Sequence, residues 1–235
     1  CCSCRFLGLS AAAEAKRLID AGELGEIYHI NWINRRNRNR SGIEYQPQSR
    51  WFLDVSKSGG GVLMDWGPYD FAAIAEMFAP VRMDVQAAWT ARPITGADPA
   101  DIELKTEQHV GASLILHRRN GATIPISYER AACTHGPDAT LLDVDGTRGA
   151  VRWDWLAGGK VDYSSDQAGK LTTQTTMHAD DKNLGPHDKP LNYFFARIHG
   201  KSSPAIVNEQ AVFNFSCLRA IYDAAATGKP QTVVL

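Results

Sequence analysis

Apolar residues recur at every third or fourth position near both ends of the chain, which is the period of an amphipathic helix. Such repeats cover residues 10–21, 65–78, 191–198 and 212–225. Ser10 is a suitable N-cap for the first predicted helix, and Gly22 can end it in the left-handed conformation. In the second helix, Pro68 falls in the first turn, where its missing N–H needs no intrahelical partner.

Between these helices, apolar and polar residues alternate, which is typical of β-strands. The predicted strands cover residues 26–34, 83–89, 110–117, 122–130, 141–145, 151–155, 161–163 and 171–176. Asn120-Gly121 is a strong turn signal for one hairpin, and residues 146–149 join another. Residues 34–48 are polar and are predicted to form a long loop.

This order of elements predicts an α+β fold, in which a large, mostly antiparallel β-sheet has helices packed on one face. The length of 235 residues is sufficient for one large domain with a proper core. Neither a linker nor an internal repeat divides the sequence. Residues 1–235 are therefore expected to form a single domain.

The composition narrows the class of protein. Hydrophobic residues make up 44% and charged residues 22%, which is ordinary for a soluble globular protein. The net charge of −1 gives no general attraction to nucleic acid or to anionic membranes, and no apolar run approaches the roughly 20 residues of a membrane span.

Five cysteines occur, at positions 1, 2, 4, 133 and 217. The Cys1-Cys2-x-Cys4 cluster could suggest a metal site, but structural zinc needs four ligands, usually as two separated pairs, and the sequence has no second pair. We therefore expect reduced structural thiols and a cytoplasmic location.

Four segments resemble, in the same order, the second domain of the Gfo/Idh/MocA (glucose-fructose oxidoreductase, inositol dehydrogenase) family. They span residues 15–27, 58–70, 145–152 and 218–230, so the resemblance covers nearly the whole chain. The second segment resembles the family signature, a glycine triplet followed by Asp-x-Gly-x-His. In this sequence it reads Gly59 to Gly61, then Asp65-x-Gly67-x-Tyr69.

The resemblance implies a substrate-binding half without its nucleotide-binding half. Family members begin with a Rossmann domain that carries Gly-x-Gly-x-x-Gly and a Glu-Lys-Pro motif whose lysine faces the nicotinamide, and neither motif occurs here. The glycine triplet follows a polar loop rather than a buried strand, so it is not expected to cradle phosphate. Cys4-Arg5-Phe6 is expected to match the end of the last Rossmann strand. NAD or NADP should then bind mainly to the missing N-terminal domain, and this chain alone should be inactive.

The same resemblance implies that Tyr69 and Asp65 are catalytic. In the family, a histidine at the position of Tyr69 usually takes the hydroxyl proton, and tyrosine stands there in glucose-fructose oxidoreductases and dihydrodiol dehydrogenases. A phenol with a pKa near 10 would need a nearby cation, which the lysine of the missing domain could supply. The alternative is structural, with Tyr69 a half-buried helix aromatic and Asp65 a helix cap.

Other polar residues are candidates for substrate binding. Arg50 and Trp51 precede the glycine triplet, where family members often have a tryptophan–arginine pair near the substrate, and His187 lies where a family histidine often contacts sugar hydroxyls. Arginines crowd at positions 35, 36, 38 and 40, which fits either recognition of an anionic sugar or phosphate, or a solvated loop. A polar stretch at positions 178, 180, 181, 187 and 188 matches no standard metal site.

The sequence therefore leads to an NAD(P)-dependent oxidoreductase that acts on a sugar, a polyol or a related CH–OH group. The rival hypothesis is a non-catalytic sugar-binding or dimerisation module without cofactor. A sugar hydrolase that uses Asp65 lacks an identifiable second carboxylate. In the family, the open face of the sheet commonly packs against a second subunit. We expect a homo-oligomer through that face, with Ala88, Ile115 and Pro125 on it, and no nucleic-acid or membrane partner.

Overall fold

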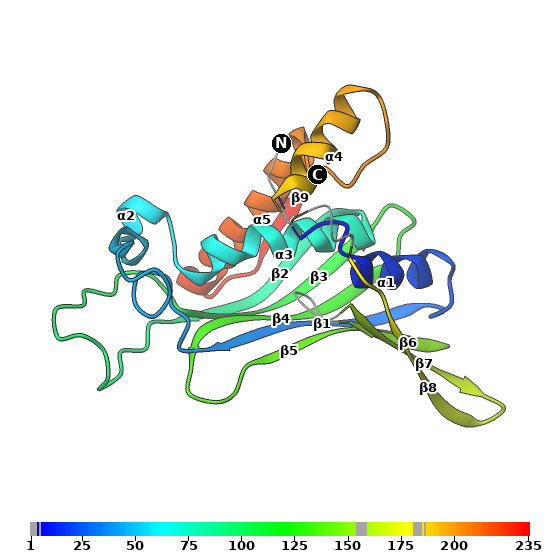
Figure 1. Ribbon diagram of the computed structural model, residues 1–235, viewed down its shortest axis with the longest axis horizontal. Coiled ribbons are helices and arrows are strands. Elements are labelled where there is room, and N and C mark those ends of the chain that lie inside the picture. The colour runs from blue at the N-terminus through cyan, green and yellow to red at the C-terminus, as the bar shows by residue number, and fades with distance from the viewer. Residues whose placement is uncertain (1–3, 5, 154–158, 181–184, 186) are drawn as a thin grey trace.

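One large sheet forms the body of the protein. The computed structural model describes residues 4, 6–153, 159–180, 185 and 187–235. Within these residues, nine strands pair in the order β8-β7-β6-β5-β1-β4-β3-β2-β9 (Figure 1). The strands are β1 Ile27–Asn37, β2 Pro80–Ala91, β3 His109–Arg118, β4 Thr123–Thr134, β5 Ala139–Gly146, β6 Gly149–Trp153, β7 Lys160–Gln167, β8 Lys170–Met177 and β9 Gln231–Val234. β1 pairs with β4 in parallel and the other neighbours pair antiparallel, so the predicted mostly antiparallel sheet is confirmed.

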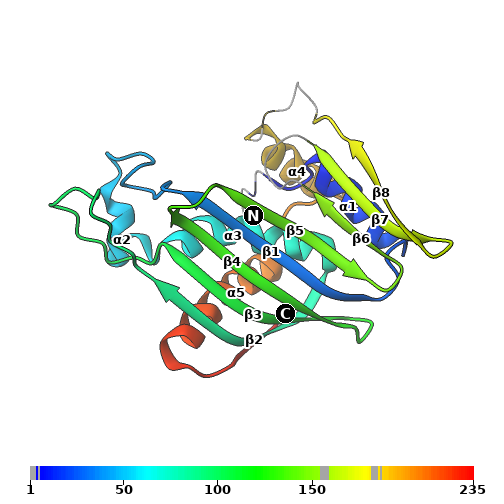
Figure 2. The same cartoon turned by 90° about the horizontal axis from the view of Figure 1, so that it is seen from below.

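Helices cover one face of this sheet. They are α1 Ser10–Asp20, α2 Val55–Ser58, α3 Val62–Phe78, α4 Asp188–Ile198 and α5 Asn208–Thr227, with a 3₁₀ turn at Arg50–Leu53. α1, α3 and α5 lie on the same side of the strands (Figure 1). Seen from the opposite side, the strands lie in front of the helices (Figure 2). The predicted α+β architecture is therefore confirmed.

Alternation along the central strands builds the core. In β3 and β4, the even-numbered residues point to the helices, and Leu114, Leu116, Ile124 and Ile126 are buried. They pack with apolar side chains of α3 and α5 in one cluster that includes Phe71, Ile74, Phe78, Leu218 and Ile221. The hairpin turn between β3 and β4 contains Gly121 with φ +85°, as the Asn-Gly signal predicts. The β5–β6 hairpin is also confirmed, although residues 154 and 155 of the predicted second strand lie outside the described residues.

Two helices begin differently from the prediction. α3 begins at Val62, three residues earlier than expected, so Pro68 lies inside the helix and not in its first turn. Ser10 is the first residue of α1, whose N-cap position is Leu9. The backbone N–H and the hydroxyl of Ser10 both donate to Asp180 Oδ1 at 2.9 Å. The Asp180 carboxylate, from a distant segment, therefore caps the start of α1 in place of the predicted Ser10 hydroxyl.

The predicted loop after the first strand is also shorter than expected. β1 continues to Asn37 because its later residues pair with both neighbours, for example Arg35 with Ala131 of β4 and Ala139 of β5. The chain then turns at Arg38, which has a φ of +38°. None of the helices in the described part of the chain is long and apolar enough to cross a membrane.

The open face of the sheet contains two of the three residues predicted for it. Ile115 pairs with Pro125, and the neighbours of both along their strands are buried on the helix side. Ala88 was assigned wrongly, because it packs against the core beside Ala112. The register of β2 is irregular between Val85 and Ala87, and this irregularity reverses the alternation expected from the sequence.

Candidate active site

Asp65 and Tyr69 lie one turn apart on α3, so their side chains share a face of that helix. Asp65 Oδ2 accepts a hydrogen bond of 2.9 Å from the hydroxyl of Ser41, which lies in the loop after β1. Tyr69 is half-buried, with its ring edge-on to Phe6 at a centroid distance of 5.1 Å and tilted against Trp66 at 5.9 Å. The helix thus holds one carboxylate and one phenol in fixed positions.

The glycine triplet forms the entrance to this helix. Gly59 ends α2 with a φ of +77°, and a methyl group at Gly61 would overlap the backbone oxygen of Glu107. The Glu107 carboxylate accepts from the N–H groups of Gly61 and Leu63 at 2.8 and 3.0 Å, and from the hydroxyl of Tyr222 at 2.7 Å. Burial and the adjacent Glu107 raise the pKa of Tyr222, so its phenol stays protonated and donates. The positive end of α3 is therefore already occupied by a buried carboxylate.

A small cavity of about 10 Å³ lies beside Asp65, which is room for roughly one water molecule. It is lined by Ser41, Phe52, Gly61, Val62, Asp65, Trp66, Gln108 and Ala132. A much larger and mainly apolar cavity of about 740 Å³ lies between α1, α3 and α4. Its walls include Phe6, Met77 and Tyr193, but none of the predicted site residues.

The three predicted substrate-binding residues lie in different surroundings. Trp51 is 49% exposed and stacks on Phe52, a wall of the small cavity, at 4.0 Å between ring centroids. Arg50 is exposed and forms an ion pair of 3.2 Å with Asp101. His187 is exposed directly before α4, a helix that stands away from α2 and the loop beside it (Figure 1). Asp65 and Tyr69 thus lie on one helix, and Trp51 reaches the cavity at Asp65 through Phe52.

The polar stretch before α4 serves the packing of the chain. Asp180 accepts from Ser10 and from Lys189, whose Nζ lies 3.3 Å away, and His178 Nε2 lies 2.9 Å from the hydroxyl of Thr176. Asp181 lies outside the described residues. Within the described ranges, no group of three or more His, Cys, Asp or Glu side chains could hold a metal ion.

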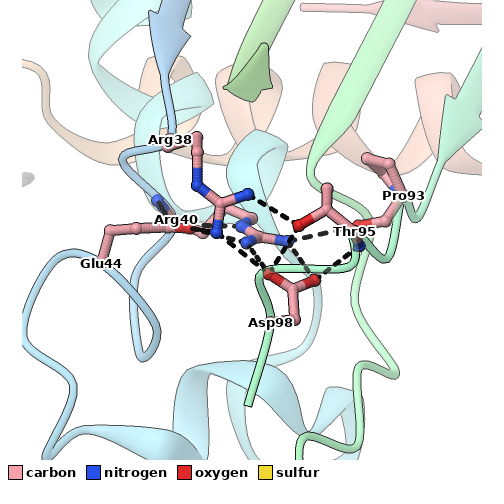
Figure 3. Close-up of polar contacts among 6 residues, drawn as sticks. All are labelled: Arg38, Arg40, Glu44, Pro93, Thr95 and Asp98. Atoms are coloured by element: carbon pink, nitrogen blue, oxygen red, sulfur yellow. Dashed lines mark hydrogen bonds and ion pairs between the residues drawn. The ribbon is translucent and has the colours of Figure 1, made fainter. Parts of the chain in front are cut away.

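Each of the four clustered arginines has a carboxylate partner. Arg35 forms two hydrogen bonds of 2.8 Å with Glu129, and Arg36 pairs with Asp138 at 3.1 Å. Arg38 and Arg40 share Glu44 and Asp98 (Figure 3). The side chain of Arg40 is only 1% exposed, so the interpretation as a solvated loop is wrong for that residue.

A buried network supports the helix behind Tyr69. Asp70 is fully buried and accepts from Trp32 Nε1 at 2.9 Å, from the Tyr128 hydroxyl at 2.8 Å and from two nitrogens of Arg130. Burial raises the pKa of Tyr128, and the charge of Asp70 adds to the effect, so the phenol remains a donor. The Arg130 guanidinium lies 5.4 Å from the ring centroid of Trp66. This network fixes α3 against β1 and β4.

Sequence reasoning missed Ser41, Glu107, Gln108 and Asp70 as parts of the site region. Asp70 directly follows Tyr69 within the glycine-rich signature, which is a local signal that could have identified it. Ser41 and Glu107 reach α3 from 24 and 44 or more residues away. No periodic pattern reports contacts of that kind.

The family model of the GFO/IDH/MocA C-terminal domain matches residues 12–152 of this chain, which is more than half of its 235 residues. The chain belongs to the GFO/IDH/MocA family. No curated protein matches it in sequence. Its assignment to the family agrees with the resemblance carried by the glycine triplet and Asp65-x-Gly67-x-Tyr69.

Solved structures show the same fold as this GFO/IDH/MocA domain at low sequence identity. Levoglucosan dehydrogenase, in complex with NADH and levoglucosan, superposes with a TM-score of 0.74 and 17% identity over 98% of this chain and 65% of that chain. An NAD-binding oxidoreductase from Klebsiella pneumoniae gives a TM-score of 0.72 and 16% identity, covering 98% of this chain and 65% of that one. An oxidoreductase from Agrobacterium radiobacter in complex with NAD⁺, L-tartaric acid and magnesium gives 0.66 and 16%, covering 94% of this chain and 61% of that one. The chain thus spans about two thirds of the length of these proteins.

Proposed function

We propose that this chain is the substrate-binding half of an NAD(P)-dependent oxidoreductase that acts on a sugar, a polyol or a related CH–OH group. In this proposal, residues 1–235 form a single substrate-binding domain that works with an N-terminal dinucleotide-binding domain. The observation that carries it is the placement of Asp65 and Tyr69 on one face of α3, within the signature of an oxidoreductase family. The structure of levoglucosan dehydrogenase with NADH and L-sorbose supports the substrate class.

Tyr69 is the proposed acid/base, and Asp65 its partner. Oxidation of a CH–OH group requires a hydride acceptor, which the nicotinamide supplies, and a base for the hydroxyl proton. Tyr69 would take that proton, while Asp65 would accept a hydrogen bond from the substrate. A tyrosine base needs a cation beside it, and Arg130 is not suitable because its charge is balanced by Asp70. The cation is therefore expected from the N-terminal domain.

The start of α3 does not fit the phosphates of a dinucleotide. The N-terminus of α3 is filled by the Glu107 carboxylate, so a phosphate placed there would meet a negative charge instead of free N–H groups. We therefore propose that NAD or NADP binds mainly to the N-terminal domain and that this chain alone is inactive.

Substrate recognition is proposed for Trp51, Arg50 and His187. The cavity at Asp65 is too small for a sugar. A sugar would therefore lie over its mouth, against Trp51, and be enclosed by the N-terminal domain. His187 is exposed directly before α4 rather than beside the cavity at Asp65, so we place it last among the three.

A second candidate is a sugar-binding or dimerisation module without catalysis. The open sheet face favours it, because Trp89 is 49% exposed there and lies edge-on to His109 at 4.8 Å. The same face is our proposed contact for a homo-oligomer. We also propose a cytoplasmic location, which is supported by the free, buried thiols of Cys133 and Cys217.

Calorimetric titration with NAD(H) and NADP(H) tests whether the cofactor binds to the N-terminal domain rather than to this chain. The isolated chain is compared with the complete polypeptide that contains it. Binding to the complete polypeptide alone supports the oxidoreductase. Micromolar binding to the isolated chain contradicts our account of the cofactor, and binding to neither favours the non-catalytic module.

The variant Tyr69→Phe then tests the acid/base in the complete enzyme. Removing the hydroxyl should lower kcat by roughly 10²- to 10⁴-fold, the usual contribution of a general base. Tyr163→Phe is the matched control, because Tyr163 lies on β7 near the β8 edge of the sheet and donates to the backbone oxygen of Glu23. Equal activity of the wild type and Tyr69→Phe would rule out the assigned role.

A further inference from the structure

The loop after β1 is built around a buried arginine. Arg40 has all five guanidinium N–H groups engaged: Nε donates to Glu44, Nη1 to Asp98 and to the backbone oxygen of Pro93, and Nη2 to Glu44 and Asp98. Its pKa is raised, because the bonds to Glu44 and Asp98 outweigh the burial that alone would lower it. Arg40 therefore has no donor left for a ligand, and its role is internal.

The two carboxylates come from two different connections. Glu44 lies four residues further along the same loop, and Asp98 lies in the connection between β2 and β3 (Figure 3). Arg38 donates to Asp98 at 3.1 Å and to Thr95 Oγ1 at 2.7 Å. We call Arg38, Arg40, Glu44, Thr95 and Asp98 the Arg40 cluster. Its two positive and two negative charges balance, which argues against an anion site and for a tie between the two connections.

The residue next to Arg40 is Ser41, which donates to Asp65. The backbone on both sides of Ser41 is fixed. The Arg40 carbonyl accepts from the N–H groups of Ile43 and Tyr45, each at 3.1 Å, and Gly42 donates to the Tyr45 carbonyl at 2.8 Å. Gly42 has a φ of +83° and is buried against Leu53. The position of the Ser41 hydroxyl is therefore set by the Arg40 cluster.

The second connection also reaches the start of α3. After Asp98 it supplies Glu107, which caps α3, and Gln108, which lines the cavity at Asp65. The Arg40 cluster thus joins two segments that position Asp65. The loop after β1 contacts Asp65 directly through Ser41, and the connection between β2 and β3 caps α3, the helix that carries Asp65.

We propose that Ser41 and the Arg40 cluster form a positioning unit that holds the Asp65 carboxylate in its working orientation. Ser41 supplies the direct hydrogen bond. The ion pairs of Arg40 with Asp98 and Glu44 hold the loop in a fixed position relative to α3. The inference rests on the proposed function of Asp65, but its structural part can be measured without any activity.

The structural part is tested on the chain itself by the carboxyl ¹³C resonance of Asp65, assigned by its loss in Asp65→Asn. Ser41→Ala and Asp98→Asn should shift this resonance, and Ser41→Thr, which keeps the hydroxyl, should not. Asp138→Asn is the matched control, because it removes the exposed partner of Arg36 outside the cluster. An unchanged resonance in both Ser41→Ala and Asp98→Asn overturns the proposal.

The functional part is tested in the complete enzyme with saturating cofactor. Ser41→Ala should lower kcat by about fivefold or more, the equivalent of one hydrogen bond, with KM changed by less than about twofold. Asp98→Asn should lower kcat in the same manner, whereas Ser41→Thr and Asp138→Asn should keep it. Wild-type kcat in Ser41→Ala, when Asp65→Asn is inactive, overturns the positioning role. Full activity of Asp65→Asn and Tyr69→Phe would instead overturn the proposed function. The carboxyl ¹³C resonance of Asp65 would then be the test of whether Ser41 and the Arg40 cluster position Asp65.

Discussion

Arg40 and Arg130 are both buried arginines, yet they are paired in different ways. Arg130 has one carboxylate partner, Asp70, which lies on α3 directly after Tyr69. Arg40 has two partners, Glu44 and Asp98, on two connections at the end of the sheet. The first pair fixes a helix to a sheet, and the second fixes one loop to another. Loss of one carboxylate should therefore leave Arg130 without a counter-charge, whereas Arg40 should keep its second carboxylate partner.

The largest expected effect is that of Asp70→Asn. The substitution leaves the Arg130 guanidinium buried without a counter-charge, which should lower the free energy of unfolding by about 3–5 kcal/mol. Urea denaturation of the chain measures it. A loss below about 1 kcal/mol would mean that water or another group reaches Arg130, and that the two arginines do not differ as described.

Asp98→Asn should have a smaller effect, because Glu44 remains beside Arg40. We expect a loss of about 2–3 kcal/mol, since one charged partner is removed while the amide oxygen can still accept. The change should also be local. The Ile43 and Tyr45 amides, which donate to the Arg40 carbonyl, should exchange with solvent faster than in the wild type, while amides of β4 should not. A loss as large as that of Asp70→Asn would remove the distinction between the two arginines.

The contrast between the two regions also explains what could be predicted from the sequence. The longer helices and the hairpins follow from local periodicity and turn residues, so most elements and the α+β class were predicted, whereas α2 and β9 were not. The periodicity of residues 65–78 placed Asp65 and Tyr69 on one helix, and the family resemblance assigned them catalytic roles. The parallel pairing of β1 with β4 was not predicted, because it depends on partners about 100 residues apart.

The buried arginines were missed for the same reason. Arg40 was interpreted within a polar loop, since its carboxylate Asp98 is 58 residues away. Arg130 ends a predicted strand, and its partner Asp70 is 60 residues away. The earlier start of α3 depends on Glu107, and the wrong placement of Ala88 depends on an irregularity in β2, neither of which leaves a periodic signal.

The open face of the sheet provides a third carboxylate that can be tested by pH. Burial alone would raise the pKa of Asp84, but hydrogen bonds from Arg82, Thr232 and His117 outweigh it and lower the pKa to about 2. The unfolded value is about 3.9, so the bonds stabilise the fold above that pH and the benefit is lost as the pH falls toward 2.

This shift corresponds to about 2–3 kcal/mol of stability. Asp84→Asn should therefore lose about that amount at pH 6 and show a smaller further loss between pH 5 and pH 2 than the wild type. Thr232→Val, which removes one donor, should lie between them. Parallel acid curves for Asp84→Asn and the wild type would exclude Asp84 as a source of acid sensitivity.

Substitution of Arg35 should have the smallest effect on the free energy of unfolding. Arg35 forms two hydrogen bonds with the Glu129 carboxylate, but its side chain is 48% exposed. In a single copy of the chain solvent screens such a pair, so at concentrations too low for association Arg35→Gln should cost less than about 1 kcal/mol, and the difference should shrink in 1 M salt. The pair lies on the same face as Trp89, where we propose that a second copy binds. In that case the loss should exceed this limit and should grow with protein concentration, because dissociation then accompanies unfolding. A small, salt-sensitive and concentration-independent loss would mean that the face is solvated, and that the Arg35 pair differs from those of Arg40 and Arg130 only in its exposure.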